Sequence, residues 1–186
     1  MALTFDNRLD PDFRAYGSDL SLVYTPLHGT GSASVIPALE NAGFRNVHVV
    51  ESQRDPDGNF PTVHSPNPEE GAALAEAISL AKRVSAKLVL GTDPDSDRVG
   101  IAVPDQQESS GYRLLNGNET GALLVNYVLR GRKNSGQLNV AMDFVAKTIV
   151  TSNLMADLGR SYGLHVHETL TGFKWIADVI RREEGR

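Results

Sequence analysis

Residues 87–103 read KLVLGTDPDSDRVGIAV, two apolar runs separated by a charged stretch. The runs are rich in aliphatic and β-branched residues, which predicts a strand on each side. Between them, Asp93, Asp95 and Asp97 occupy alternate positions, and Arg98 follows at once. Three carboxylates this close repel one another unless a cation lies among them. Mg²⁺ prefers oxygen ligands, and a guanidinium can form paired hydrogen bonds with phosphate, so the stretch predicts a Mg²⁺ site beside a phosphate site.

The same stretch has three other interpretations. A solvated acidic turn needs no ligand at all. An EF-hand loop starting at Asp93 needs glycine at its sixth position and glutamate at its twelfth, where this chain has Arg98 and Pro104. The DxD motif of a glycosyltransferase leaves Asp97 and Arg98 without a role, yet it stays open at this point.

The composition limits what the protein can bind. The 186-residue chain has a net charge of −5, no cysteine and 40% hydrophobic residues. The negative charge argues against a general nucleic-acid interface but allows a local basic pocket. Without cysteine, disulfides and thiolate metal sites are excluded. No apolar run reaches the length of a membrane span, and the first residues lack a signal peptide's apolar stretch, so we expect a cytoplasmic protein that binds neither nucleic acid nor membranes.

Short apolar strands and helical patterns alternate along the chain. In the first half, strands are expected over 20–24, 46–50, 87–91 and 99–103, and helices over 32–41 and 71–84. A similar alternation follows residue 111, starting with a strand and a capped helix. This order favours an α/β fold: two consecutive small α/β domains with mixed, largely parallel sheets flanked by helices.

The predicted division of the chain is a linker or tail over 1–18, a first domain over 19–108 and a second over 109–186. Within the first domain, residues 51–68 hold four of the nine prolines and predict a long loop. Asn67 as N-cap and Pro68 at the first helical position then favour a helix start.

The run DPDSDR, residues 93–98, resembles the metal loop of the α-D-phosphohexomutase superfamily, which includes phosphoglucomutases and phosphomannomutases. The common family form is D-G-D-G-D-R, and here Pro94 and Ser96 replace the two glycines. This variant is most similar to the branch that contains phosphoglucomutase-2 and phosphopentomutase. Four further segments resemble the family in the same order: YTPLHGTG (24–31), DPDGNFPTVHSPNPEE (55–70), GNETGALL (117–124) and ETLTGFKWI (168–176).

The resemblance implies that residues 19–108 are the family's second domain and 109–186 most of its third. It implies an enzyme that interconverts sugar 1-phosphates and 6-phosphates, or pentose 1- and 5-phosphates, through a phosphoserine and a bisphosphate intermediate. The resemblance further implies that Asp93, Asp95 and Asp97 hold Mg²⁺.

The resemblance also assigns roles to a basic pair and to a turn near the end of the chain. Arg98 would contact the phosphoryl group in transit, and Lys174 would act with it as a catalytic residue. Thr171, Gly172, Phe173 and Lys174 would form a turn that binds the sugar phosphate. We further expect Trp175 and Ile176 to pack the last helix while Lys174 projects the other way.

The family's nucleophile motif, T-A-S-H-N-P-like, does not occur in this sequence. Ser65, in HSPNP, falls in the second-domain loop and is a poor candidate for the nucleophile. We therefore expect a central fragment that is inactive alone and acts with domains 1 and 4 of the same polypeptide. A non-catalytic module that binds Mg²⁺ or sugar phosphate is the alternative.

The remaining candidates are histidines and glycines. His28 and His64, both in loops, could face the phosphoryl group or simply bond nearby backbone. His165 and His167 alternate along a predicted strand and are expected to share one face without forming a zinc site. The glycines of the G-T-G stretch, 29–31, could let the backbone approach phosphate or serve an ordinary turn.

Overall fold

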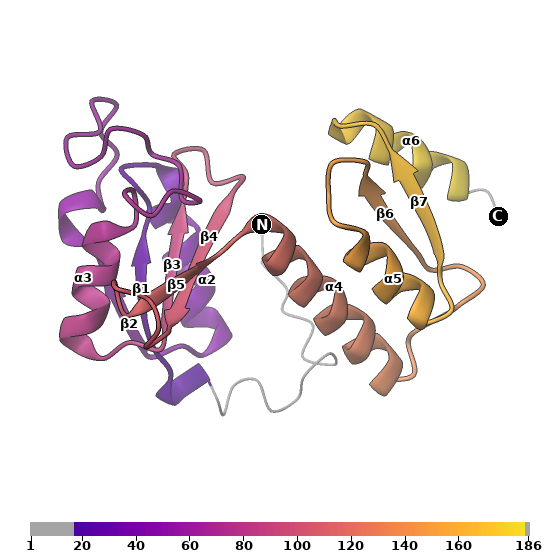
Figure 1. Ribbon diagram of the computed structural model, residues 1–186, viewed down its shortest axis with the longest axis horizontal. Helices are drawn as coiled ribbons and strands as arrows, with labels where there is room; N and C mark the ends of the chain where they lie inside the picture. Colours follow the sequence, from indigo (N-terminus) through magenta and orange to yellow (C-terminus); the bar gives the residue numbers. More distant parts are fainter. Residues whose placement is uncertain (1–16, 185–186) are drawn as a thin grey trace. The chain divides into compact units, whose positions relative to one another are not determined.

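The computed structural model describes residues 17–184 and divides into two compact units, the first ending at Gly117 and the second beginning at Asn118 (Figure 1). Most of the predicted tail or linker, residues 1–16, lies outside the described residues. No helix within 17–184 combines the length and the apolar character needed to cross a bilayer.

The first unit contains β1 (Ser21–Thr25), the 3₁₀ turn η1 (Thr30–Ala33), α2 (Val35–Ala42), β2 (Asn46–Val49), the 3₁₀ turn η2 (Glu51–Gln53), α3 (Ala75–Val84), β3 (Leu88–Thr92), β4 (Val99–Pro104) and β5 (Tyr112–Leu115). The second unit contains most of α4 (Gly117–Asn134), then β6 (Phe144–Thr148), α5 (Asn153–Ser161), β7 (His165–Thr169) and α6 (Phe173–Glu183).

The first sheet has the strand order β2-β1-β3-β4-β5. β1 runs parallel to β2 on one side and to β3 on the other, whereas β3–β4 and β4–β5 are antiparallel. Since the chain steps from β1 to β2 in one direction and from β2 to β3 in the other, right-handed crossovers place α2 and α3 on opposite faces of the sheet. The predicted mixed, largely parallel α/β fold is confirmed.

The core of the first unit lies between the sheet and α3. Ala77 and Ala81, both fully buried, bring the α3 backbone close to the sheet, and Ile78 and Leu74 fill the space beside them. The helix begins at Ala75 rather than near Pro68, because the preceding residues form successive tight turns. Asn67 still caps the first of these turns, since its Oδ1 accepts the Glu69 N–H at 3.1 Å.

The second unit is a parallel pair, β6 and β7, with a helix on each face. The small residue Gly159 of α5 packs against Val145 and Val166 on one face. On the other face His167 lies 3.4 Å from Glu183 of α6. The crossover from β6 through α5 to β7 is the same βαβ device as in the first unit.

The observed division differs from the predicted one at residue 108. β5 pairs with β4 through residues 112–115, as the second strand of a hairpin, so it belongs to the first sheet. The first unit therefore extends to Gly117.

We predict that Gly100→Ala destabilises the first sheet. A Cβ at Gly100 would lie 2.6 Å from the Pro68 carbonyl carbon, and backbone cannot give way cheaply. The opening free energy of β4, measured by amide hydrogen exchange, should fall by about 1–3 kcal/mol. Gly71→Ala is the matched control, because no atom lies within 4 Å of its added Cβ. Equal effects of the two substitutions would contradict this packing.

Candidate metal and phosphate site

The aspartate run forms the hairpin loop that joins β3 to β4. Thr92 pairs with Val99 across the last rung of the antiparallel ladder, so residues 93–98 close the loop. One carboxylate oxygen each from Asp93, Asp95 and Asp97 lies within 4.8 Å of the others, and no other such group of three occurs among residues 17–184. An all-oxygen set suits Mg²⁺, and the exposed Asp95 and Asp97 side chains are able to close on an ion.

Arg98 anchors the buried carboxylate of this group. Asp93 is 1% exposed; its Oδ1 accepts the Arg98 backbone N–H at 3.0 Å and its Oδ2 accepts Arg98 Nε–H at 2.8 Å. Burial alone would raise the pKa of Asp93, but these hydrogen bonds and the guanidinium charge outweigh it and hold the pKa below its ordinary value. The Arg98 side chain remains 53% exposed, so its outer nitrogens are available to an anion.

The two exposed carboxylates repel each other. The charge of Asp95 is the largest cause of a raised pKa at Asp97, followed by partial burial and by the charge of Asp93. The fold therefore holds negative charge together at a cost, and a cation among these oxygens would remove that cost.

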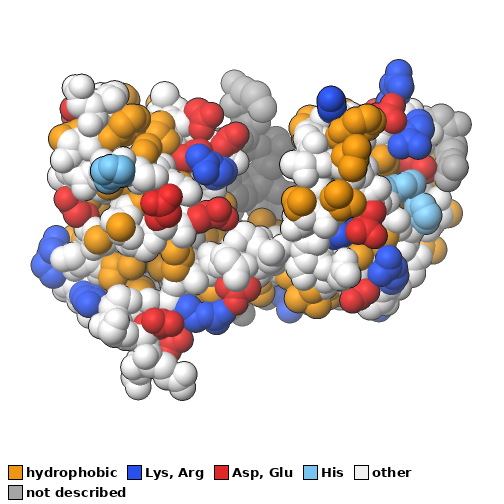
Figure 2. All heavy atoms as spheres, turned by 45° about the horizontal axis from the view of Figure 1, so that its top comes forward, with side chains coloured by type: hydrophobic (Ala, Val, Ile, Leu, Met, Phe, Trp, Pro, Cys, Tyr) orange, Lys and Arg blue, Asp and Glu red, His pale blue; other side chains and the backbone are white. Residues whose placement is uncertain are grey.

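The loop lies at the topological switch point of the sheet. After β1 the chain moves to β2 on one side of the sheet, and after β3 it moves to β4 on the other side. Loops that follow two neighbouring parallel strands in this way border the crevice where α/β proteins bind ligands. Figure 2 shows acidic and basic side chains gathered on this unit's surface.

The glycines of the G-T-G stretch let the loop after β1 pack directly against the aspartate loop. A Cβ at Gly29 would lie 2.6 Å from the Pro94 carbonyl oxygen, and one at Gly31 would lie 2.6 Å from Thr92 Oγ1. Thr30 donates to the same Pro94 oxygen through its backbone N–H at 2.9 Å and its hydroxyl at 3.1 Å. These glycines therefore serve close packing of two loops.

The residues that replace the family glycines show how the loop tolerates them. Pro94 presents its carbonyl oxygen to Thr30. Ser96 adopts a left-handed backbone with φ of 62°, which costs a non-glycine residue free energy. Its hydroxyl is buried, and no hydrogen-bond partner for it is found among the described residues.

The expected substrate-facing turn follows β7 in the second unit. Thr171, Gly172, Phe173 and Lys174 are all exposed, and Gly172 has φ of 122° just before α6 begins. Lys174 Nζ lies 5.1 Å from the centre of the Trp175 ring. The expectation that Lys174 projects away from Trp175 is therefore wrong. Leu170, Phe173 and Trp175 are 54%, 76% and 40% exposed, which gives this turn an apolar surface.

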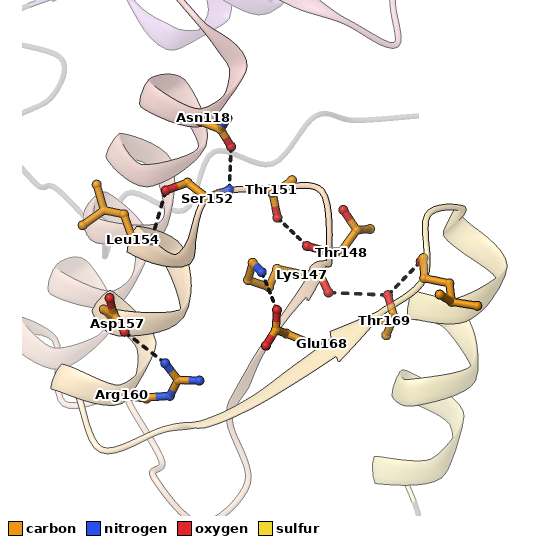
Figure 3. A network of polar contacts seen from close by, with 11 residues as sticks. Asn118, Lys147, Thr148, Thr151, Ser152, Leu154, Asp157, Arg160, Glu168 and Thr169 are labelled. Atoms are coloured by element: carbon orange, nitrogen blue, oxygen red, sulfur yellow. Dashed lines mark hydrogen bonds and ion pairs between the residues drawn. The ribbon is translucent and has the colours of Figure 1, made fainter.

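Sequence reasoning missed the ion pair beside this turn, shown in Figure 3. Lys147 of β6 is 3% exposed, and its Nζ donates to Glu168 Oε2 of β7 at 2.7 Å. This hydrogen bond, with the lysine's charge, lowers the pKa of Glu168. The sequence around Lys147 does not indicate that its side chain is buried, because its partner Glu168 lies in another strand, β7.

The loop after β6 is also fixed by polar contacts in Figure 3. Ser152 caps α5 by accepting the Leu154 N–H at 3.1 Å, and its own N–H donates to Asn118 at 2.7 Å. Because β6 and β7 run parallel, the loops that follow them lie at the same carboxyl edge, which is the usual ligand side of such a sheet.

The remaining candidates have ordinary surroundings or a structural partner. His28 is 4% exposed and its Nε2 lies 2.8 Å from Thr62 Oγ1, whereas His64 is exposed. Ser65 donates to Glu70 at 3.1 Å. The rings of His165 and His167 lie 4.2 Å apart on one face, as expected for alternate residues of a strand.

Two family models match this chain in sequence. The model described as phosphoglucomutase/phosphomannomutase, alpha/beta/alpha domain II, matches residues 7–107, and that of alpha/beta/alpha domain III matches residues 116–185. The first alone covers more than half of the chain. The chain belongs to the phosphoglucomutase/phosphomannomutase family and contains its domains II and III.

Individual relatives agree with this assignment. A probable phosphomannomutase of Haemophilus influenzae is 40% identical over 87% of the chain, and a phosphoglucomutase of Staphylococcus aureus is 41% identical over 89%. The chain spans only 32% and 29% of their respective lengths. A family protein from Burkholderia thailandensis shares the fold over 97% of this chain and 36% of its own, with a TM-score of 0.66 at 22% identity.

Asparagine substitutions at Asp93 and Asp97 should shift the stability of the metal-free protein in opposite directions. Folding lowers the pKa of Asp93 from 3.8, so its carboxylate stabilises the fold above that value. This contribution is lost as the pH falls through the lower folded-state pKa. Folding raises the pKa of Asp97, so its ionised form opposes folding at pH 7. In thermal denaturation with EDTA at pH 7, Asp93→Asn should lower the melting temperature and Asp97→Asn should raise it slightly; two equal losses would refute this electrostatic account.

Glu168→Gln should destabilise the second unit more than Lys147→Met does. The first change leaves a buried ammonium without its counter-charge, whereas the second leaves a carboxylate that is 45% exposed and hydrated. Because the pKa of Glu168 is lowered from 4.5, the pair stabilises the fold above that pH and is lost as the pH falls through the folded-state pKa. Fluorescence of Trp175, the single tryptophan, reports unfolding. The reverse order of stabilities would show that the pair is not buried as described.

Proposed function

We propose that the chain forms the two central domains of a longer sugar-phosphate mutase, and that Asp93, Asp95 and Asp97 hold its Mg²⁺. The observation that carries this proposal is the convergence of three carboxylates at a switch point, with one of them anchored by Arg98. Membership of the family and the greater length of its relatives support it.

Asp93 and Arg98 each have a definable task in phosphoryl transfer. The ion would supply positive charge next to a phosphoryl oxygen, which is the main requirement of such reactions. Asp93 holds Arg98 by Nε and by the backbone N–H, which leaves the outer guanidinium nitrogens to contact the phosphoryl group. Two fixed points on Arg98 restrict how far that contact can move.

We assign substrate contact in the second unit to the turn of residues 171–174. Lys174 is an exposed cationic donor in the first turn of α6, and Gly172, just before the helix, has the left-handed backbone. The substrate would be a hexose 1- or 6-phosphate, or a pentose 1- or 5-phosphate. The phosphoserine would come from another part of the polypeptide, because this sequence has no T-A-S-H-N-P-like motif.

Metal binding by the 186-residue chain tests the first part of this proposal. Titration with Mn²⁺, followed by electron paramagnetic resonance, should give one site that Mg²⁺ displaces. Asp95→Asn should weaken Mn²⁺ affinity at least tenfold, because it removes one of three charged ligands. Glu108→Gln, which removes one charge from an exposed loop of the same unit, should have no effect. Undiminished binding to Asp95→Asn would place the metal elsewhere.

Activity tests the second part. The longer polypeptide should convert glucose 1-phosphate to glucose 6-phosphate, or the pentose equivalent, with Mg²⁺ and a bisphosphate activator, and Lys174→Ala should reduce kcat/KM at least tenfold. The 186-residue chain alone should show no turnover. Binding of Mg²⁺ without turnover in the longer polypeptide would favour the non-catalytic module.

A further inference from the structure

The loop after β1 contains two consecutive residues in the left-handed region. Leu27 has φ of 47° and His28 has φ of 60°, although neither is glycine. Leucine rarely adopts this conformation, and it persists only where the surroundings fix it firmly. This corner immediately precedes Gly29 and Thr30, the residues that touch the aspartate loop.

A buried chain of polar side chains holds the corner. The Gln53 carbonyl oxygen accepts the His28 N–H at 3.0 Å, and the Gln53 side-chain oxygen accepts the Thr25 hydroxyl at 2.5 Å. The Leu27 N–H donates to the same Thr25 hydroxyl oxygen at 3.1 Å. Thr25 and Gln53 are both fully buried, so these bonds are shielded from water.

Thr62 joins the two ends of this hydrogen-bond network, Gln53 and His28. Its hydroxyl oxygen accepts Gln53 Nε2–H at 2.8 Å, and it lies 2.8 Å from His28 Nε2. Thr62 belongs to the long loop of residues 54–66, and a further backbone bond, Asp57 N–H to the His28 oxygen at 3.0 Å, links that loop to the corner. One hydroxyl therefore connects the long loop, η2 and the strained corner.

We propose that Thr62 is a positioning residue for the aspartate loop. Thr62 contacts the corner of Leu27 and His28, and Thr30 follows that corner two residues later. Thr30 donates two hydrogen bonds to the carbonyl oxygen of Pro94, which lies between Asp93 and Asp95 in the sequence. Loss of the Thr62 hydroxyl would leave His28 Nε2 and Gln53 Nε2 without this partner inside the protein. The corner would then relax, and the three carboxylates would lose their fixed spacing. This inference rests on the proposed Mg²⁺ site.

The test compares Mn²⁺ affinity in the 186-residue chain and its variants. Thr62→Val keeps the side-chain shape but removes the hydroxyl, and it should weaken Mn²⁺ binding about tenfold. Thr62→Ser should restore affinity to within twofold of the original. Ile78→Val, a core change in α3, serves as the control for loss of stability and should leave Mn²⁺ affinity unchanged. Hydrogen exchange of the Thr30 amide should accelerate in Thr62→Val but not in Ile78→Val.

The outcomes separate this inference from the function on which it rests. If the unaltered chain binds no Mn²⁺, the proposed metal site fails. If it binds and Thr62→Val binds equally well, or if Thr62→Ser fails to restore binding, the positioning role is wrong. Should Thr62→Val not fold, Thr30→Val tests the last contact between the corner and the aspartate loop. Thr30 is exposed, and this change removes the hydrogen bond from its hydroxyl to the Pro94 carbonyl oxygen. An affinity loss of about threefold is then expected, and unchanged affinity would overturn the proposal.

Discussion

The buried contact between Asp93 and Arg98 is the interaction on which the candidate site depends. It closes a six-residue loop between antiparallel strands, because Asp93 accepts both the backbone and the side-chain N–H of the residue five positions later. Without it, a carboxylate would be buried at the end of β3 with no compensation for its desolvation. With it, the loop can present two more carboxylates and a guanidinium at the surface.

The topology explains why this loop lies where a ligand could reach it. β1 and β3 are neighbours, and the chain leaves them in opposite directions, so the loops that follow them meet at one edge of the sheet. Gly29 permits that meeting at backbone distance, Gly31 leaves room for the Thr92 and Ser96 side chains, and Thr30 fixes the contact through Pro94. The second unit repeats the principle on a smaller scale, since the loops after β6 and β7 lie at the carboxyl edge of a parallel pair.

Much of this could be predicted from sequence because the signals are local. The apolar runs around residues 93–98 indicated the two strands, and the spacing of the aspartates indicated their convergence. Contacts between distant segments gave no such signal. The pairing of β5 with β4, the burial of Lys147 against Glu168 and the packing of Gly29 on Pro94 each depend on residues far apart in the chain. The left-handed backbone of Ser96 was also hidden, because serine gives no local indication of it.

The central claim is that Asp93, Asp95 and Asp97 share one divalent ion. The most direct measurement is the anomalous diffraction signal of crystals of the chain grown with Mn²⁺. The account predicts a single strong peak bounded by one oxygen from each of the three carboxylates, with Arg98 still bonded to Asp93. Carboxylates that point apart into solvent, with no peak between them at saturating Mn²⁺, would contradict it.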